Sequence, residues 1–268
     1  MMLDFPEGPG EAAVDEVGRG CLACEVVAAA VVLPDFSPEE WRQQISSATG
    51  EDEETHKRKG KGSGGGLRSV RDSKKMSEKQ RAESATFLRT FLEAHRHRGA
   101  AYGIGCASPE EIDRINIREA TILAMHRALD DLHRMSCSND VVKKIVVDGN
   151  AFRPYHRPPP NHRGGDDDNT DNNKGKEAVP HVCVVKGDAT RLNVAAASVL
   201  AKVHRDEMVR RYCDEAPELN TRYGFLSNKA YGTVNHIRAL REHGATSHHR
   251  KTFAPVCSFS ASPSPALT

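Results

Sequence analysis

Three short apolar runs of this sequence each end in acidic residues beside glycine, and this repeated pattern constrains the fold most. The runs and their acids are Ala12–Asp15 with Asp15-Glu16, Lys144–Val147 with Asp148-Gly149, and Val182–Val185 with Gly187-Asp188. Short runs rich in valine are typical of sheet strands. Because functional side chains of open α/β sheets gather near strand ends, we expect these acids to lie close together.

Further strand and helix patterns alternate along the chain. Glu25–Leu33 is dense in Val and Ala and predicts a buried strand. Ser77 with Gln80 forms a capping box that opens a helix, and Thr233 and Gly244 bound the last one. The other predicted helices are Pro109–Arg134 and Asn193–Arg211. Strands that alternate with helices predict an α/β sheet with helical cover.

Two internal segments have compositions that cannot bury a core. Residues 46–66 hold an acidic run, a basic run and three consecutive glycines, and residues 156–178 hold three prolines and the run Asp166–Asp168. We expect both segments to be disordered insertions, with the Asp run solvated rather than metal-bound. Residues 258–268 are expected to form a disordered tail, which leaves one domain over residues 1–257.

The acids at the strand ends indicate a divalent cation site. Asp15, Glu16, Asp148 and Asp188 would repel one another without a compensating charge. Because side chains alternate along a strand, one member of the Asp15-Glu16 pair is expected to join the distant acids. Carboxylate oxygens suit Mg²⁺ or Mn²⁺ better than zinc. Two such ions about 4 Å apart can align the attacking hydroxide and the leaving oxygen at a phosphorus atom. The acids therefore indicate phosphoryl transfer. A charged turn after a strand is the alternative.

Composition bounds the class of protein. Charge is balanced, with 38 basic and 37 acidic residues, but Lys186–Lys251 holds 12 Lys and Arg against 7 acids. Such a basic face can follow phosphates, and it is also compatible with an ordinary solvated surface. Seven cysteines without regular spacing favour reduced thiols inside a cell. Cys21 and Cys24 have a zinc-like spacing but lack a second pair. The run Val26–Leu33 is too short to cross a bilayer.

The ordered blocks of the chain resemble ribonuclease HII from about Ala12 to Val256. The resemblance rests on these blocks: Asp15-Glu16-Val17-Gly18-Arg19-Gly20, Val26–Val31, Asp72-Ser73-Lys74-Lys75-Met76-Ser77, Val147-Asp148-Gly149-Asn150, Val185-Lys186-Gly187-Asp188, Ala195–Val203 with Arg205-Asp206, Tyr223-Gly224-Phe225, and His243–Thr246 through His248-His249-Arg250.

The resemblance implies a fold and roles for single residues. The implied fold is a ribonuclease H-like mixed sheet flanked by helices, with a helical C-terminal segment, in a catalytic domain over residues 1–257. The implied catalytic residues, which would also bind Mn²⁺ or Mg²⁺, are Asp15, Glu16, Asp148 and Asp188. The implied substrate-binding residues are Gly18, Arg19, Gly20, Tyr231, Ser73 and Lys74. The loop and Tyr231 would read the ribose 2′-OH, whereas Ser73 and Lys74 would contact backbone phosphate.

The implied reaction is cleavage of the RNA strand of RNA–DNA hybrids, including the 5′ side of single ribonucleotides embedded in duplex DNA. Hydrolysis with two metal ions would give a 3′-OH and a 5′-phosphate. The implied partners are RNA–DNA hybrid and ribonucleotide-containing duplex DNA, as ribonucleotide excision repair requires. The resemblance further implies a monomer without membrane association. Its expected location is intracellular, in the cytoplasm or, in a eukaryotic host, in the nucleus.

Some residues depart from the family pattern, and other functions stay open. The family usually has Pro where this chain has Cys21, Gly-Pro where it has Cys24-Glu25, and Gly where it has Ala230. If position 230 needs a positive φ, Ala230 is expected to shift Tyr231. A ribonuclease HIII usually carries an N-terminal domain and a glutamate as the last acid, where this chain has Asp188. The remaining alternatives are a non-catalytic protein that binds hybrids and a metal-dependent nuclease for DNA.

Overall fold

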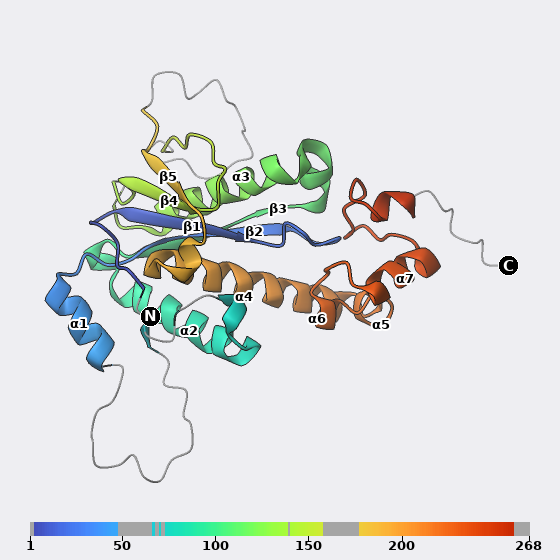
Figure 1. Cartoon of the computed structure of the whole chain (residues 1–268), viewed down its shortest axis with the longest axis horizontal. Coiled ribbons are helices and arrows are strands. Elements are labelled where there is room, and N and C mark those ends of the chain that lie inside the picture. Colours follow the sequence, from blue (N-terminus) through green and yellow to red (C-terminus); the bar gives the residue numbers. More distant parts are fainter. Residues whose placement is uncertain are drawn as a thin grey trace, which may run out of the picture.

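A mixed sheet of five strands lies between two layers of helices (Figure 1). The strands are β1 (Glu11–Val17), β2 (Val26–Val32), β3 (Ala101–Ala107), β4 (Lys144–Asp148) and β5 (His181–Val184). Their order across the sheet is β3-β2-β1-β4-β5. β1, β2 and β3 pair antiparallel, whereas β4 runs parallel to both β1 and β5. The expected mixed sheet with flanking helices is therefore confirmed.

The computed structural model describes residues 3–47, 66–67, 70, 73–138, 140–157 and 177–259, without the side chains of 45–47. Its helices are α1 (Pro38–Ser47), α2 (Glu78–Ala94), α3 (Pro109–Met135), α4 (Leu192–Glu215), α5 (Glu218–Thr221), α6 (Phe225–Asn228) and α7 (Val234–His243). Short 3-10 helices are η2 (Ser73–Lys75), η3 (Arg96–Arg98), η5 (Gly187–Ala189) and η6 (Val256–Ser258). None of the helices within these ranges combines the length and apolarity that a bilayer crossing requires.

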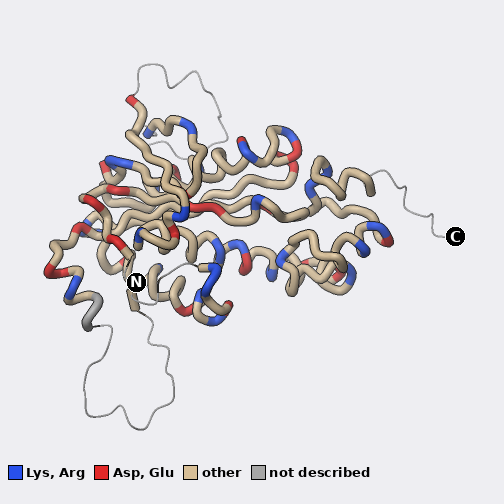
Figure 2. Tube along the Cα trace, in the orientation of Figure 1, with Lys and Arg blue, Asp and Glu red and all other residues tan. Residues whose placement is uncertain are grey.

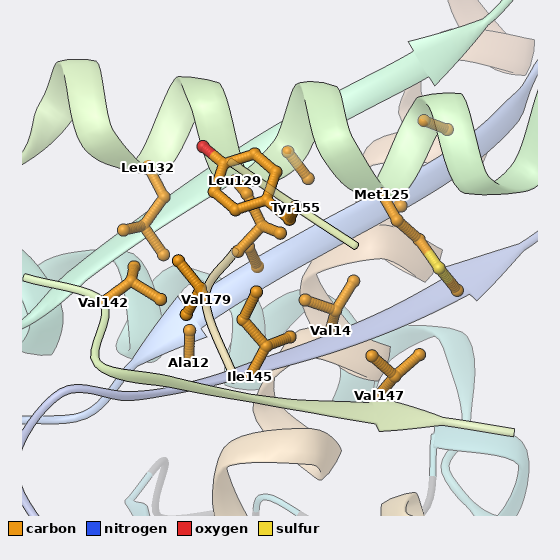
Figure 3. Packing of buried hydrophobic residues seen from close by; sticks show 14 of the residues in the cluster. Ala12, Val14, Met125, Leu129, Leu132, Val142, Ile145, Val147, Tyr155 and Val179 are labelled. Carbon is orange, nitrogen blue, oxygen red and sulfur yellow. The ribbon is translucent and has the colours of Figure 1, made fainter. Parts of the chain in front are cut away.

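Helix α3 covers one face of the sheet, and its side chains form a core with β1, β2 and β4 (Figure 3). Met125, Leu129 and Leu132 point from α3 toward Val14 and Ile145 of the sheet. α3 can approach β3 closely because β3 carries glycine where the helix passes. A β-carbon at Gly103 or Gly105 would lie 2.2 or 2.1 Å from the α3 backbone.

Helices α2 and α4 cover the opposite face of the sheet. The Ala195–Ala197 stretch of α4 and Leu88 and Leu92 of α2 pack with Ala29 and Val31 of β2. The small alanines let α4 lie close to the sheet. Helices α5 to α7 extend beyond the end of the sheet, where β1 ends and β2 begins (Figure 1). They pack on a third core that contains Phe225 and Leu240.

Most predicted elements are confirmed, including the capping box at Ser77 and the Thr233 cap of α7. The sequence analysis missed α1 and β3. The helix predicted at Pro109–Arg134 is present but interrupted at Asn116, whose φ is 67°. The side-chain oxygen of Asn116 accepts hydrogen bonds from the backbone amides of Arg118 and Glu119, so the helix restarts there with its own cap.

The segments predicted to be disordered fall mostly outside the described residues, which omit 48–65, 158–176 and 260–268. The flanks of the second segment are ordered. Tyr155 is 3% exposed and pairs with Val179 in an antiparallel bridge. Arg157 donates two hydrogen bonds to the carbonyl of Val142. The prediction of disorder is therefore wrong for residues 156–157 and 177–178, which belong to the folded part of the chain.

Candidate active site

Parallel pairing of β1, β4 and β5 brings three of the predicted acids together. Val14 of β1 lies opposite Val147 of β4, so Asp15 and Asp148 follow at the same edge of the sheet. Asp188 lies on η5, shortly after the neighbouring strand β5. One carboxylate oxygen from each aspartate lies within 4.8 Å of the other two. In the described part of the chain, no other group of three His, Cys, Asp or Glu side chains is so arranged.

Burial makes this cluster of like charges costly. Asp15 and Asp188 are 5% and 4% exposed. Desolvation, followed by the charges of Glu16 and Asp148, raises the pKa of Asp15 to about 8. Desolvation, together with the charge of Asp188, also raises the pKa of Asp148. A cation between the acids would favour their charged forms and so remove both penalties.

Hydrogen bonds hold the aspartates in place. The backbone amide of Glu16 donates to Oδ1 of Asp15 at 2.7 Å, and that of Gly187 donates to Oδ1 of Asp148 at 2.7 Å. The hydroxyl of Ser198 on α4 also hydrogen-bonds Asp15. These bonds orient the carboxylates before any ligand arrives, which is what a preorganised site requires.

Glu16, the fourth predicted acid, is directed differently. Asp15 is the member of the pair whose oxygen joins the distant acids, in keeping with the alternation of side chains along a strand. The side chain of Glu16 accepts a hydrogen bond from Nη1 of Arg19 at 3.2 Å. Desolvation raises the pKa of Glu16 despite the opposing charge of Arg19. Glu16 and Asp148 line one hollow, together with Arg19 and Arg118.

The predicted phosphate contacts Ser73 and Lys74 are on η2, which lies beside the aspartates. Ser73 is buried, and its Oγ lies 2.9 Å from Oγ of Ser198. Nζ of Lys74 lies 3.2 Å from Oδ2 of Asp188, and its side chain is largely exposed. Desolvation lowers the pKa of Lys74, but the hydrogen bond and charge of Asp188 outweigh it and raise the pKa overall. Lys74 therefore offsets part of the negative charge, and its contact with phosphate stays a prediction.

The buried side chain of Arg205 ties together two segments that flank the Gly18-Arg19-Gly20 loop. Its guanidinium donates to the carbonyls of Ala23 at 3.2 Å, Glu25 at 3.1 Å and Lys229 at 2.9 Å. The side chain is fully buried. These three hydrogen bonds satisfy carbonyls on both segments, and that of Lys229 also accepts from the thiol of Cys21, so Arg205 fixes the two segments relative to each other.

Arg250 holds the same loop from the other side. It is also fully buried, and it donates from Nε to the carbonyl of Cys24 at 2.9 Å and from Nη1 to that of Arg19 at 3.0 Å. Its own backbone amide donates to the carbonyl of Leu22 at 2.9 Å. The conformation of the predicted ribose-reading loop is thus set by residues far away in the sequence.

Tyr231 lies next to this loop. It forms an antiparallel bridge with Cys21, and the amide of Leu22 donates to the carbonyl of Ala230 at 2.9 Å. The Tyr231 side chain is 41% exposed, which leaves much of the ring accessible. Ala230 has a φ of 65° and Cys24 a φ of 64°. Both positions therefore adopt the left-handed backbone that favours glycine, at a cost of about 1–2 kcal/mol each.

Most of the chain matches the sequences of one protein family. The family model of ribonuclease HII matches residues 67–256. A ribonuclease HII of Parabacteroides distasonis is 38% identical over 255 residues, which cover 94% of each chain. The chain belongs to the ribonuclease HII family. It is accordingly a ribonuclease H, a hydrolase that acts on phosphodiester bonds.

Solved structures agree with this ribonuclease HII fold. The ribonuclease H2 from Pyrococcus horikoshii OT3 has a TM-score of 0.57 at 21% identity, over 93% of this chain and 96% of that chain. A complex of Bst-RNase HIII with Mn²⁺ has a TM-score of 0.50 at 16% identity, over 95% of this chain and 72% of that chain. At these identities the likeness shows the fold alone.

The donor set of this ribonuclease HII site fits a hard divalent cation. Asp15, Asp148 and Asp188 offer carboxylate oxygens alone, which suit Mg²⁺ or Mn²⁺. The raised pKa of Asp15 shows that its charged form is unfavourable here, and a bound cation would stabilise that form. Cys21 and Cys24, considered above as zinc ligands, are free and buried and belong to no such group among the residues described.

Several residues of the site were missed by the sequence analysis. Ser198 and Arg205 lie on the face of α4 that a helical pattern assigns to packing, and nothing local marks them as polar supports. Arg118 lies on the hollow beside Glu16, two residues after the interruption of α3 at Asn116. The sequence blocks shared with the family contain Ser198, Arg205 and Arg250, and this is the signal that could have indicated them.

Proposed function

We propose that this ribonuclease HII is an endonuclease that cuts the RNA strand of RNA–DNA hybrids and nicks duplex DNA on the 5′ side of a single embedded ribonucleotide. The observation that carries the proposal is the continuity between the acids and the loop. β1 carries Asp15 and Glu16 and leads directly into Gly18-Arg19-Gly20, with Tyr231 alongside. A site that reads a ribose is thereby adjacent to a site that hydrolyses a phosphodiester.

The aspartates would hold the metal ions of the reaction. Mg²⁺ or Mn²⁺ bound by Asp15, Asp148 and Asp188, with Glu16 beside them, would supply positive charge to activate water and to stabilise the leaving 3′-oxygen. Backbone amides and Ser198 keep the carboxylates of Asp15 and Asp148 in fixed orientations. The proposed products are a 3′-OH and a 5′-phosphate.

Discrimination between RNA and DNA would come from the loop and Tyr231. The 2′-OH is both a donor and an acceptor, and it is what distinguishes a ribonucleotide from its deoxy counterpart. A site built to hydrogen-bond that hydroxyl rejects a sugar without it, because its polar groups are then left unpaired. The exposed ring of Tyr231 is placed to stack on a nucleotide next to the loop.

Basic side chains around the acids would bind the nucleic-acid backbone. Figure 2 shows Lys and Arg spread along α4 and the C-terminal helices, on the side of the sheet where α2 also lies. Lys74 and Arg19 are the basic residues paired directly with acids of the site. Such contacts position a duplex without reading its sequence.

The remaining parts of the proposal concern the state of the protein. RNA–DNA hybrid and ribonucleotide-containing duplex DNA are the proposed partners, Mn²⁺ or Mg²⁺ the cofactor, and a monomer the active form. All seven cysteines are free, as in proteins of reducing compartments. We therefore propose an intracellular location, where its DNA substrate also lies.

The test uses a labelled DNA duplex with one ribonucleotide, incubated with Mn²⁺ or Mg²⁺. Wild type is compared with Asp148→Asn and with an all-DNA duplex of the same sequence. The expected result is a metal-dependent nick 5′ of the ribonucleotide that is lost in the variant and absent from all-DNA. Cutting of a long hybrid without this nick would refute the single-ribonucleotide activity, and inactivity of folded protein on both substrates would favour a protein that only binds hybrids.

A further inference from the structure

Two buried histidines lie directly behind Tyr231, and the proposed function gives them no role. His236 is on α7, and His249 is in the segment that follows it; they are 0% and 1% exposed. Their Nε2 atoms are 3.0 Å apart. The rings of Tyr223 and Phe225 pack against both imidazoles, so the pair is shut off from solvent.

The groups at the two ends of the pair fix every proton in it. The backbone amide of Thr246 can only donate, and it donates to Nδ1 of His249 at 3.0 Å. Nδ1 of His249 therefore carries no proton, and its Nε2 must carry one. At the other end, the carbonyl of Tyr231 can only accept, and it lies 2.9 Å from Nδ1 of His236. Nδ1 of His236 therefore carries a proton.

The middle contact follows from these two ends. Nε2 of His249 donates to Nε2 of His236, which must be unprotonated, because two N–H groups cannot face each other at 3.0 Å. Both rings are thus neutral, with opposite tautomers. Burial is consistent with this state, since desolvation lowers the pKa of His236 and lowers that of His249 to about 3.

The chain of hydrogen bonds connects the two sides of the ribose-reading site. His249 pairs with Ala23 in an antiparallel bridge, just after the Gly18-Arg19-Gly20 loop. His236 ends the chain on the peptide of Tyr231. That peptide follows two left-handed residues, Lys229 and Ala230, with φ of 51° and 65°. A strained turn of this kind persists only where its surroundings hold it.

We propose that His236 and His249 are positioning residues for ribose recognition, acting as a neutral, one-way chain of hydrogen bonds that fixes Tyr231 against the Gly18-Arg19-Gly20 loop. The role in ribose recognition rests on the proposed function, whereas the existence of the hydrogen-bond chain does not. Neither histidine touches the substrate. Their effect is on the place of the Tyr231 peptide, and hence on the preference for a ribonucleotide over a deoxynucleotide.

The first test reads the tautomers directly in the wild-type protein. Long-range ¹H–¹⁵N spectra of imidazole-labelled protein at pH 7.5 distinguish protonated from unprotonated ring nitrogens. His236→Gln and His249→Gln identify the two signals among the 13 histidines. We expect His249 to be protonated at Nε2 and His236 at Nδ1. The reverse assignment, or a charged ring at this pH, would overturn the proposal without bearing on catalysis.

The second test separates positioning from simple packing. Asparagine at position 236 places an amide near the Nδ1 site and keeps a donor for the Tyr231 carbonyl, whereas glutamine places its amide near Nε2 and does not. Both lose the imidazole. Binding is measured in an Asp148→Asn background, as the ratio of the dissociation constants for all-DNA and single-ribonucleotide duplexes. We expect His236→Gln to lower this ratio about tenfold and His236→Asn to keep it within about twofold.

His243→Gln is the matched control, because it makes the same change on the same helix at a partly exposed position. It is expected to leave the ratio unchanged. Equal losses in His236→Gln and His236→Asn would show a packing role and overturn the positioning role alone. A wild-type ratio near one would overturn the proposed function and this inference together, whereas the tautomers would still report whether the chain exists.

Discussion

The guanidinium of Arg205 occupies the space that a β-carbon at position 18 would need. Such a β-carbon on Gly18 would lie 2.4 Å from Nε of Arg205, and Gly18 has a φ of +93°. Gly20, two residues later, has no atom within 4 Å of a corresponding β-carbon. The two glycines of the loop therefore differ: Gly18 is required for the fold of the site, whereas Gly20 leaves room that a substrate can use.

Alanine substitution should separate these two requirements. Gly18→Ala is expected to lower the free energy of unfolding by about 3 kcal/mol, because overpacking and a positive φ both oppose it. Gly20→Ala should change it by less than about 1 kcal/mol. Urea unfolding measures both values. If Gly20→Ala retains stability but loses nicking, the loop contacts substrate there, and equal destabilisation by both variants would contradict the difference.

Arg205→Lys should destabilise the protein despite the retained charge. An ammonium group cannot donate to the carbonyls of Ala23, Glu25 and Lys229 with the planar geometry of a guanidinium, so buried acceptors are left without partners. We expect a loss of about 3 kcal/mol in the free energy of unfolding. The control is Arg210→Lys on the same helix, whose exposed pair with Glu78 should matter by less than about 0.5 kcal/mol. Similar losses would contradict a special role for Arg205.

Divalent metal should stabilise the protein through the aspartate cluster. At 100 times its dissociation constant, Mn²⁺ is expected to raise the free energy of unfolding of wild type by about 2.7 kcal/mol. Asp148→Asn should lose most of this gain, and without metal it should be at least as stable as wild type, because it removes one of three packed like charges. Asp214→Asn, at an exposed position, is the control. Full metal stabilisation of the Asp148 variant would show that the ion binds elsewhere.

The buried histidine pair should make stability depend on pH. His249 has a pKa lowered to about 3, against an ordinary value of 6.5, by desolvation and by the repulsion that a charged His249 would meet from protonated forms of His236 and His248. Because the folded pKa lies below the unfolded one, its contribution is fully present above pH 6.5 and is lost as pH falls toward 3. Between pH 6 and 4 this one group should lower the free energy of unfolding by about 1.4 kcal/mol per pH unit. His249→Gln should reduce the measured slope by that amount, and an unchanged slope would contradict the buried neutral state.

The fold was largely predictable because its signals are local. The Val-rich strands and the capped helices can be recognised from a few neighbouring residues. Asp15, Asp148 and Asp188 were predicted to meet because all three lie at or near strand ends. β3 was missed because Gly103 and Gly105 weaken a strand pattern. Glycine is needed at these positions because the backbone of α3 passes too close for a β-carbon. This requirement comes from tertiary packing, and the local sequence does not reveal it.

The supports of the site were missed for a similar reason. Arg205 and Arg250 donate hydrogen bonds to backbone carbonyls of the loop region, which lie between 180 and 231 residues earlier in the chain. Every residue has a backbone carbonyl, whatever its type. The sequence therefore does not show which residues accept hydrogen bonds from a buried arginine. Such supports become visible only when the chain is folded.

Arg118 illustrates how a change in helix geometry can create a binding position. The interruption of α3 at Asn116 restarts the helix, with the Asn116 side chain capping the amides of Arg118 and Glu119. Arg118 then lines the hollow that Glu16 and Asp148 also line. A guanidinium there can bind a backbone phosphate next to the one that is cleaved.

Arg118→Ala should therefore weaken binding of a ribonucleotide-containing duplex about fivefold and reduce the salt slope of binding by about 1. Fluorescence anisotropy in the Asp148→Asn background, at several salt concentrations, measures both quantities without cleavage. Arg114→Ala removes the same charge from an exposed position one turn earlier on α3, outside the hollow, and should change affinity by less than about twofold. If both variants lose affinity equally, α3 acts through its general positive field, and Arg118 makes no local contact with phosphate.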